Sequence, residues 1–155
     1  MQIRAILAAD REALADLLQR TENFTADEIQ VAQELIDDSI HRPESGYQTI
    51  VALAGDAVVG YLCYGRTPMT RRTFDLYWMA VDGARRGAGI GRRLVEDLER
   101  RVREGGGGLI RVETSTREGY DGTLAFYLRT GYQIASRLPD FYDTDDDLVT
   151  LTKVL

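Results

Sequence analysis

The middle of the chain contains two strand-like segments with a long helical segment between them. Residues 74–81 form a run of aromatic and aliphatic side chains, which favours a strand, and residues 109–114 have the same character. Between them, apolar residues recur at every fourth position of segment 90–103: Ile90, Leu94, Leu98 and Val102. Because a strand, a helix and a second strand in this order usually form a right-handed crossover, the segment predicts a β-α-β unit within a sheet.

The segments on either side of this unit predict a mixed sheet. Residues 47–53 and 57–64 indicate an antiparallel hairpin that turns at Gly55. The other expected elements are a strand at 3–7, helices that start at Asp10 and Thr25, a helix at 123–130, and strands at 132–137 and 148–155. The expected fold is α/β (α+β), with a central mixed, mostly antiparallel sheet of six to seven strands flanked by about four helices.

Length and composition restrict the number of domains, the cellular compartment and the classes of ligand. The chain has 155 residues and no linker-like tract, so we expect one domain over residues 1–155. No apolar run could span a membrane, and the start of the chain lacks the pattern of a secretory signal. The single cysteine, Cys63, suits a reducing cytoplasm. The net charge of −6 argues against nucleic-acid binding, and the single histidine, His41, argues against a metal site.

A short segment inside the β-α-β unit has the composition of an anion-binding loop. Residues 85–93 hold four arginines and three glycines, and no acidic residue occurs from Gly83 until Glu96. Glycines let the backbone approach a ligand closely, and the start of a helix offers free N–H groups and a partial positive charge. These properties together favour phosphate binding at the N-terminus of the helix.

Two common phosphate-binding loops do not fit this segment. A Walker loop would need Gly-Lys followed by Ser or Thr, which is absent here. A dinucleotide fingerprint would need a third glycine where Arg92 stands, and a bulky side chain there would spoil the packing of the helix on the strand.

Three pieces of the sequence are similar to the GCN5-related N-acetyltransferase (GNAT) superfamily. Segment 86–91, Arg-Gly-Ala-Gly-Ile-Gly, resembles the family's R/Q-x-x-G-x-G/A signature, and segment 76–82 before it resembles the family's fourth strand. Segment 123–132 is similar to its A-x-x-x-Y-x-x-x-G-F element, although Thr123 replaces the usual alanine and Tyr120 stands where asparagine is frequent. From Gly119 onward the chain resembles a branch of small bacterial acetyltransferases.

The resemblance implies binding of acetyl-coenzyme A (acetyl-CoA) and transfer of its acetyl group to a primary amine by direct attack in a ternary complex. The residues that it places against the cofactor are Met79, Ala80, Val81, Arg86, Gly87, Ala88, Gly89, Ile90, Gly91 and Arg92. The resemblance also makes Tyr127 the proton donor to the departing thiolate. The expected partner is a small-molecule or peptide amine, and a homodimer is compatible with the family.

Several alternatives remain open from the sequence. The general base could be Asp75, Glu113 or a water chain, and Arg111 could instead neutralise either carboxylate. Segment 140–147 holds five acids beside Phe141 and Tyr142, which could line an acceptor site for cations or form a solvated turn. The alternative to an enzyme is a non-catalytic acyl-CoA sensor, against which Tyr127 argues.

Overall fold

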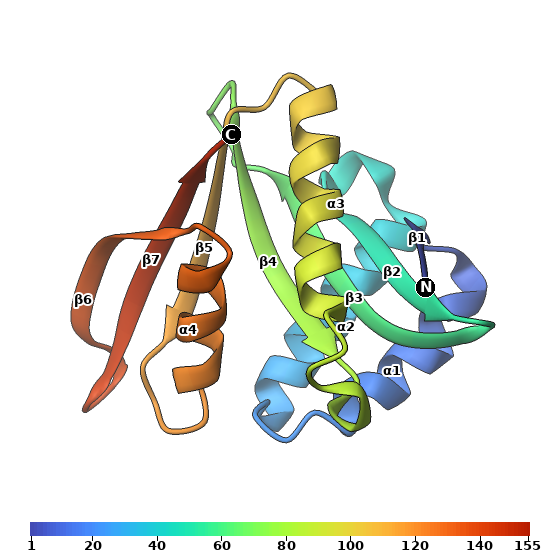
Figure 1. Cartoon of the computed structure of the whole chain (residues 1–155), viewed down its shortest axis with the longest axis horizontal. Coiled ribbons are helices and arrows are strands. Elements are labelled where there is room, and N and C mark those ends of the chain that lie inside the picture. Colours follow the sequence, from blue (N-terminus) through green and yellow to red (C-terminus); the bar gives the residue numbers. More distant parts are fainter.

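The computed structural model describes residues 1–155, and its centre is a seven-stranded sheet with the strand order β1-β2-β3-β4-β5-β7-β6 (Figure 1). The pairing of β4 with β5 is parallel and every other pairing is antiparallel. The strands are β1 (Gln2–Ala5), β2 (Gln48–Ala54), β3 (Ala57–Arg66), β4 (Thr73–Val81), β5 (Leu109–Ser115), β6 (Gln133–Asp143) and β7 (Asp146–Val154). The helices are α1 (Arg11–Gln19), α2 (Ala26–His41), α3 (Ile90–Glu104) and α4 (Asp121–Arg129). The expected fold class is therefore confirmed.

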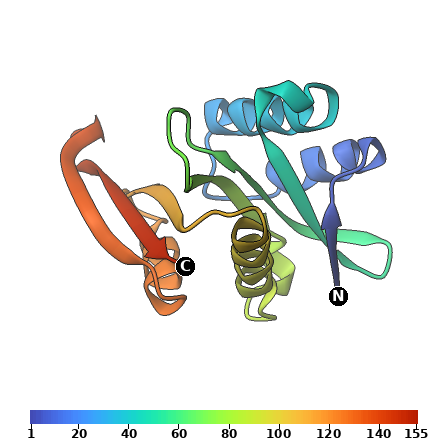
Figure 2. The ribbon, with the colours of Figure 1, turned by 90° about the horizontal axis from the view of Figure 1, so that it is seen from above.

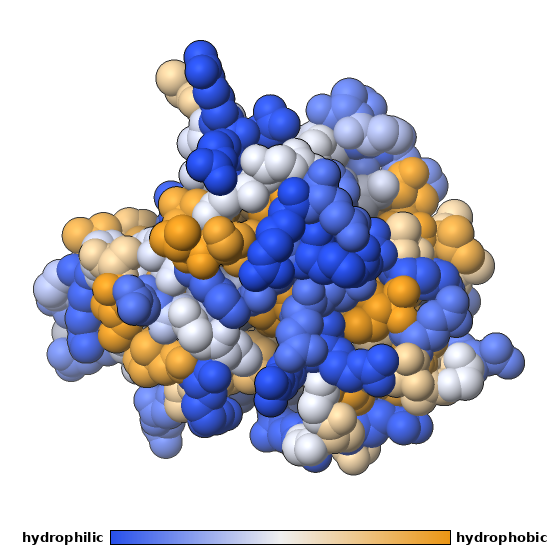
Figure 3. All heavy atoms as spheres, turned by 45° about the horizontal axis from the view of Figure 1, so that its top comes forward, coloured by the Kyte–Doolittle hydropathy of each residue, from blue (hydrophilic) through white to orange (hydrophobic).

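Two pairs of helices cover the two faces of the sheet (Figures 1 and 2). On one face α1 and α2 pack through Leu14, Leu18 and Ile36. On the other face α3 packs through the expected apolar stripe, and all four of its residues are buried. The outer side of α3 carries ion pairs such as Arg92 with Glu96, and hydrophilic side chains crowd over this helix in the space-filling view (Figure 3). No helix combines the length and apolar character that a membrane span requires.

β4 and β5 separate half-way along the sheet. They pair only from Thr73 to Leu76 on β4, and residues 77–81 then continue against β3 alone. β4 also contains a bulge, because Tyr64 lies opposite Leu76 whereas Cys63 lies opposite Trp78, which leaves Tyr77 as the extra residue. The separation opens a wedge between the two halves of the sheet.

The largest difference from the expected elements is in β6. The sequence predicts a strand that ends at Arg137, but β6 continues to Asp143, through Pro139. Its only partner is β7, so β6 lies at the edge of the sheet and is exposed along its whole length. Proline is tolerated in an edge strand because the N–H that it lacks has no partner there.

Lys153 is the only lysine of the chain, and it connects β7 to α3 and α4, the two helices that cover the same face of the sheet. Its Nζ donates to Glu99 Oε1 on α3 at 2.8 Å and to the carbonyl oxygen of Thr130, directly after α4, also at 2.8 Å. The carboxylate of Glu99 is buried, and its other cation, Arg103, lies farther away at 3.9 Å, so it depends mainly on Lys153. Lys153 therefore fixes the spacing of α3 and α4 on the two sides of the wedge.

We predict that Lys153→Met lowers the free energy of unfolding by about 3 kcal/mol, because it leaves the Glu99 carboxylate buried beside an apolar side chain. Urea denaturation measures the loss. Adding Glu99→Leu to the same chain should recover most of it, since the unpaired charge is then removed. Equal stability of the single variant and the wild type would contradict the structural importance of the pair.

Candidate functional site

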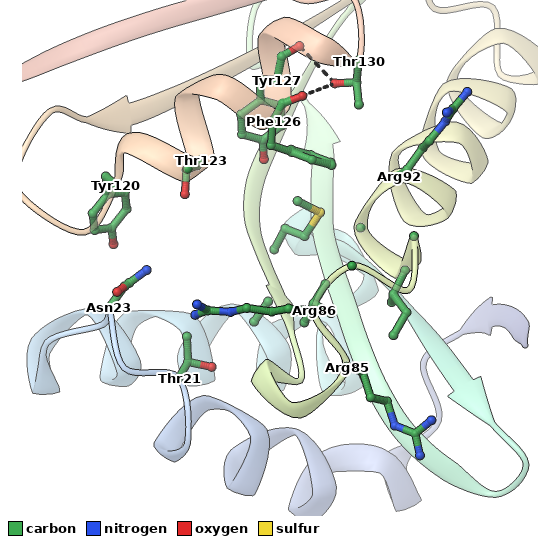
Figure 4. A pocket seen from close by; sticks show the side chains of 18 of the residues that line it. Thr21, Asn23, Arg85, Arg86, Arg92, Tyr120, Thr123, Phe126, Tyr127 and Thr130 are labelled. Carbon is green, nitrogen blue, oxygen red and sulfur yellow. Dashed lines mark hydrogen bonds between the residues drawn. The ribbon is translucent and has the colours of Figure 1, made fainter.

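A cavity of about 970 Å³ lies where β4 separates from β5. Its wall is formed by the end of β4, the N-terminus of α3, one side of α4 and the loop between α1 and α2 (Figure 4). Nine of the ten residues that the resemblance places against a cofactor line this cavity: Met79, Ala80, Val81, Arg86, Gly87, Gly89, Ile90, Gly91 and Arg92.

The N-terminus of α3 presents unpaired backbone donors to the cavity. Gly89 is the N-cap residue in a left-handed conformation (φ 76°), and no side chain caps the helix. The amides of Ile90, Gly91 and Arg92 have no backbone acceptor. A Cβ atom added at Gly89 would meet no atom within 4 Å, so this position is open to a ligand. This is the geometry of an anion site at a helix N-terminus.

Ala88 is the residue of this loop that does not line the cavity. Its N–H donates to the carbonyl oxygen of Arg85 at 3.2 Å, in the turn that precedes the helix. Its amide is therefore already engaged, and the free donors of the loop lie at the neighbouring positions.

Arg86 supplies positive charge to the same cavity. It has no ion pair within the protein, and Figure 4 shows its guanidinium reaching across the cavity toward Asn23 and Thr21. Arg92, by contrast, lies along α3 and bonds Glu96 at 2.9 Å. Arg85 lines the cavity as well, but Figure 4 shows its side chain directed away from Asn23 and Thr21. The loop thus offers the guanidinium of Arg86 together with the helix amides.

The separated end of β4 offers backbone groups to the wedge. Asp82 donates its N–H to the carbonyl oxygen of Val59 on β3. Because alternate residues of a strand direct their N–H and C=O groups to the same side, those of Ala80 also face β3. The backbone groups of Met79 and Val81 face the opposite side, where β5 has moved away.

Tyr127 lies on α4 at the boundary of two cavities. Its ring is buried and contacts those of Phe126 and Tyr132 edge-on, with centroid distances of 5.2 Å and 5.4 Å. Burial raises the pKa of Tyr127 well above its ordinary value, so the hydroxyl stays protonated. The side chain lines both the large cavity and a smaller one of about 410 Å³.

The two cavities share one wall. The residues common to both are Phe24, Met79, Tyr120, Thr123 and Tyr127. Figure 4 shows Thr123 and Tyr127 on the side of α4 that faces the cavity, and Tyr120, before α4, directed toward Asn23. Two molecules, one in each cavity, would therefore meet at this wall.

A hydrogen-bonded cluster closes the smaller cavity on the side of α2. Tyr120 donates to Glu28 Oε2 at 2.9 Å, and Arg117 donates to the other oxygen of Glu28 at 2.5 Å. Burial alone would raise the pKa of Glu28, but the hydrogen bonds from Arg117, Thr25 and Tyr120 outweigh it and lower that pKa. Asn23 also donates to the carbonyl oxygen of Gly119, which joins the two loops over the wedge.

The two candidate bases lie in different surroundings. Glu113 lines the smaller cavity, half-exposed, and its nearest cation is Arg111 at 3.7 Å. Asp75 lines neither cavity: it is buried, accepts from Arg111 at 2.6 Å and accepts from Thr67 at 2.7 Å. The hydrogen bond to Asp75 raises the pKa of Arg111.

Only one of the five acids near the last turn reaches a cavity. Asp146 lines the smaller cavity and accepts from Ser115. Asp147 pairs with Arg137 at 2.7 Å, and Asp140 and Asp143 accept from backbone amides of the turn. Of the two alternatives for the acidic segment, a turn therefore describes most of it, and only Asp146 and Tyr142 of this segment line a cavity.

The sequence did not indicate several residues of the smaller cavity. Tyr77 and Trp78 are consecutive, and the sequence indicated only that they belong to a strand. In a regular strand they would point to opposite faces, but the bulge at Tyr77 directs both of them to the face that α1 and α2 cover. Glu28 and Phe24 carried only the signal of a helix start. Tyr120, noted as a departure from the family pattern, holds Glu28 in place.

Comparison with known proteins agrees with this geometry. Residues 11–132 match the model of the Acetyltransferase (GNAT) family. The blasticidin-S acetyltransferase of Streptomyces morookaense is 41% identical over 68 residues, which are 43% of this chain and 46% of that protein, so the match spans less than half of that relative.

Solved structures show the same fold over nearly the whole chain. A GNAT-family acetyltransferase structure from Desulfovibrio desulfuricans has a TM-score of 0.94 and 37% identity, and the match covers 99% of this chain and 98% of that one. An aminoglycoside 6'-N-acetyltransferase complexed with coenzyme A has a TM-score of 0.78 and 23% identity, with 99% and 97% covered. On the family match, the fold and the glycine loop at the start of α3, this chain belongs to the GNAT family of acetyltransferases.

Proposed function

We propose that this protein transfers the acetyl group of acetyl-CoA to a primary amine of a small molecule by direct attack in a ternary complex. The observation that carries the proposal is the meeting of two cavities at Tyr127, one with an anion site and the other lined by carboxylates. We further propose that residues 1–155 act as one domain and that the protein works in the cytoplasm, where the buried free thiol of Cys63 stays reduced.

The larger cavity fits coenzyme A in its size and its donors. The free amides at the start of α3 and the guanidinium of Arg86 suit the pyrophosphate. The backbone of Met79 and Val81 suits the pantetheine arm, which can pair with β4 like an added strand in place of β5. The related fold of the aminoglycoside 6'-N-acetyltransferase complexed with coenzyme A supports this assignment.

The shared wall suits acyl transfer. The amine nitrogen attacks the thioester carbonyl carbon, a backbone N–H of Val81 or Met79 stabilises the oxyanion, and the carbon–sulfur bond then breaks. The hydroxyl of Tyr127, which stays protonated, donates a hydrogen bond to the departing thiolate and can pass its proton to the sulfur as the negative charge develops there. Positioning of both reactants in adjoining cavities supplies much of the remaining rate.

Glu113 is the carboxylate that suits the general base. It lines the acceptor cavity, whereas Asp75 is held by Arg111 and Thr67 outside it. We propose that the proton of the attacking amine passes to Glu113 through water in the cavity, and that Asp75 serves to orient Arg111.

The name of one relative supports a small-molecule acceptor, because blasticidin-S acetyltransferase matches part of this chain. The fold alone does not decide, since it is shared by an aminoglycoside N-acetyltransferase and by a ribosomal-protein-alanine N-acetyltransferase from Brucella melitensis. A non-catalytic acyl-CoA sensor is the less suitable alternative, because a sensor needs neither a second cavity nor a buried phenol at the boundary of the two.

The first prediction concerns the anion site. Acetyl-CoA should raise the Tm of the wild type, and Gly89→Asp should abolish that shift, because it places a carboxylate at the helix N-terminus. Gly89→Asn is the matched control, with the same size and the same left-handed backbone but no charge, and it should retain part of the shift. Calorimetric binding of acetyl-CoA to Gly89→Asp with wild-type affinity would place the coenzyme elsewhere.

The second prediction concerns the leaving group. Tyr127→Phe should lower kcat by about 10- to 1,000-fold while the affinity for acetyl-CoA changes little, since only the hydroxyl is lost. Steady-state release of free thiol measures kcat, and a pre-steady-state burst shows whether chemistry limits it. An unchanged kcat with chemistry limiting would reduce Tyr127 to a packing role.

The third prediction separates the two carboxylates. Glu113→Gln should lower kcat about 10- to 100-fold near neutral pH and recover activity as the pH approaches about 10, where alkylamines lose their proton unaided. Asp75→Asn should instead lower the melting temperature and keep most of kcat. If Asp75→Asn shows the pH-dependent recovery and Glu113→Gln does not, the assignment of the base is reversed.

A further inference from the structure

The smaller cavity carries more negative charge than an amine transfer requires. Its charged residues are Glu28, Glu113, Asp146 and Arg117. Arg117 is bonded to Glu28, so the charges of these two residues offset each other. Asp146 accepts only the neutral hydroxyl of Ser115, and Glu113 lies 3.7 Å from Arg111 without a hydrogen bond to it. The cavity therefore keeps a surplus of negative charge.

The three carboxylates come from different elements and converge on one region. Glu28 is on α2, Glu113 on β5, and Asp146 at the start of β7. Partial burial raises the pKa of Tyr142, and three carboxylates raise it further: those of Glu113, Asp146 and Glu28. All three therefore act on the part of the cavity beside Tyr142, a residue that does not line the larger cavity.

Aromatic rings face the same space. The bulge in β4 brings Tyr77 and Trp78 to one side of the sheet, and both line the cavity together with Tyr142. Phe24 packs edge-on to Trp78 with a centroid distance of 5.3 Å, which holds the indole ring in place. Aromatic rings beside carboxylates attract organic cations through both the ring quadrupole and the charge.

A buried hydroxyl without a partner lies in the wall of the same cavity. Thr114 lines the smaller cavity, is only 5% exposed, and its Oγ1 has no hydrogen-bond partner in the protein. A buried hydroxyl without a partner costs free energy, and a polar group of a bound molecule that reached Oγ1 would recover part of that cost.

Glu113 is enough to take the proton of the reacting amine and Arg117 offsets Glu28, so the charge of Asp146 has no role in that proton transfer. That amine must be neutral when it attacks, and nearby carboxylates favour its protonated form. They do stabilise a second group that remains cationic throughout the reaction. We propose that the acceptor is a small compound with two basic groups: one amine at Tyr127 is acetylated, and a second cation is held beside Asp146, Trp78 and Tyr142.

This inference rests on the proposed acetyl transfer and specifies its acceptor. The cavity volume of about 410 Å³ limits the acceptor to a small molecule. Putrescine and butylamine are suitable probes, because they share a four-carbon chain and a primary amine, and only putrescine carries a second ammonium group. The aromatic wall would favour butylamine if apolar contact alone decided affinity.

Binding is measured by calorimetry on the complex with free coenzyme A, in which no acetyl group can be transferred. Putrescine should bind about tenfold more tightly than butylamine, and raised salt should reduce that advantage. Asp146→Asn should lower the affinity for putrescine to nearly that for butylamine, because the amide still accepts the hydrogen bond from Ser115 but carries no charge. Asp145→Asn is the matched control: it changes the net charge equally, one residue earlier in the same turn, outside both cavities.

Thr114→Val tests the same site without risk to the fold, since it replaces a buried unpaired hydroxyl by a methyl group of similar size. It should leave the melting temperature unchanged or raise it, and weaken putrescine binding about two- to fivefold. Equal affinity for both amines, or an equal loss in Asp145→Asn and Asp146→Asn, would overturn the inference.

Turnover distinguishes this inference from the proposed function. If thiol is released with butylamine as fast as with putrescine, acetyl transfer stands and the second cation site is wrong. If neither these amines nor a broad amine library releases thiol from acetyl-CoA, the proposed function itself fails.

Discussion

The parting of β4 from β5 is the constraint on which the rest of the site depends. The two strands pair over only the first part of β4, after which the backbone groups of Met79 and Val81 lose the partner that a continuous sheet would give them. Unpaired backbone groups in a protein interior are costly, so such a wedge persists only where something holds it open. Lys153 does so from one side, by fixing α3 and α4 against β7. From the other side, the hydrogen bond between Asn23 and Gly119 and the bonds to Glu28 join the loops across it.

Much of this arrangement could be predicted from the sequence, because its signals are local. The apolar stripe of α3, the hairpin of β2 and β3 and the helix start at Thr25 each depend on residues a few positions apart, and the structure contains all three. The glycine loop could be recognised in the same way, since glycines and arginines close in sequence must also be close in space. Ala88 shows the limit of that reasoning: composition places it in the loop, but its amide bonds Arg85.

The smaller cavity could not be predicted in the same way, because distant segments build it. Glu28, Glu113 and Asp146 are far apart in the chain, and only the folded sheet brings them to one region. The bulge at Tyr77 is equally hidden, since it depends on the register between β3 and β4 rather than on any residue of β4 alone. The acidic turn stayed ambiguous for the opposite reason: its carboxylates are close in sequence, but the sequence does not show that most of them bond the turn itself.

The position of Trp78 has a practical consequence. It is the only tryptophan of the chain, it lies in the wall of the smaller cavity, and Phe24 from the loop after α1 packs against its ring. Its ultraviolet emission therefore comes from a single known place in the fold. The intrinsic fluorescence of the protein therefore reports on this cavity wall. A shift in emission wavelength or intensity would follow ligand binding there without an attached dye.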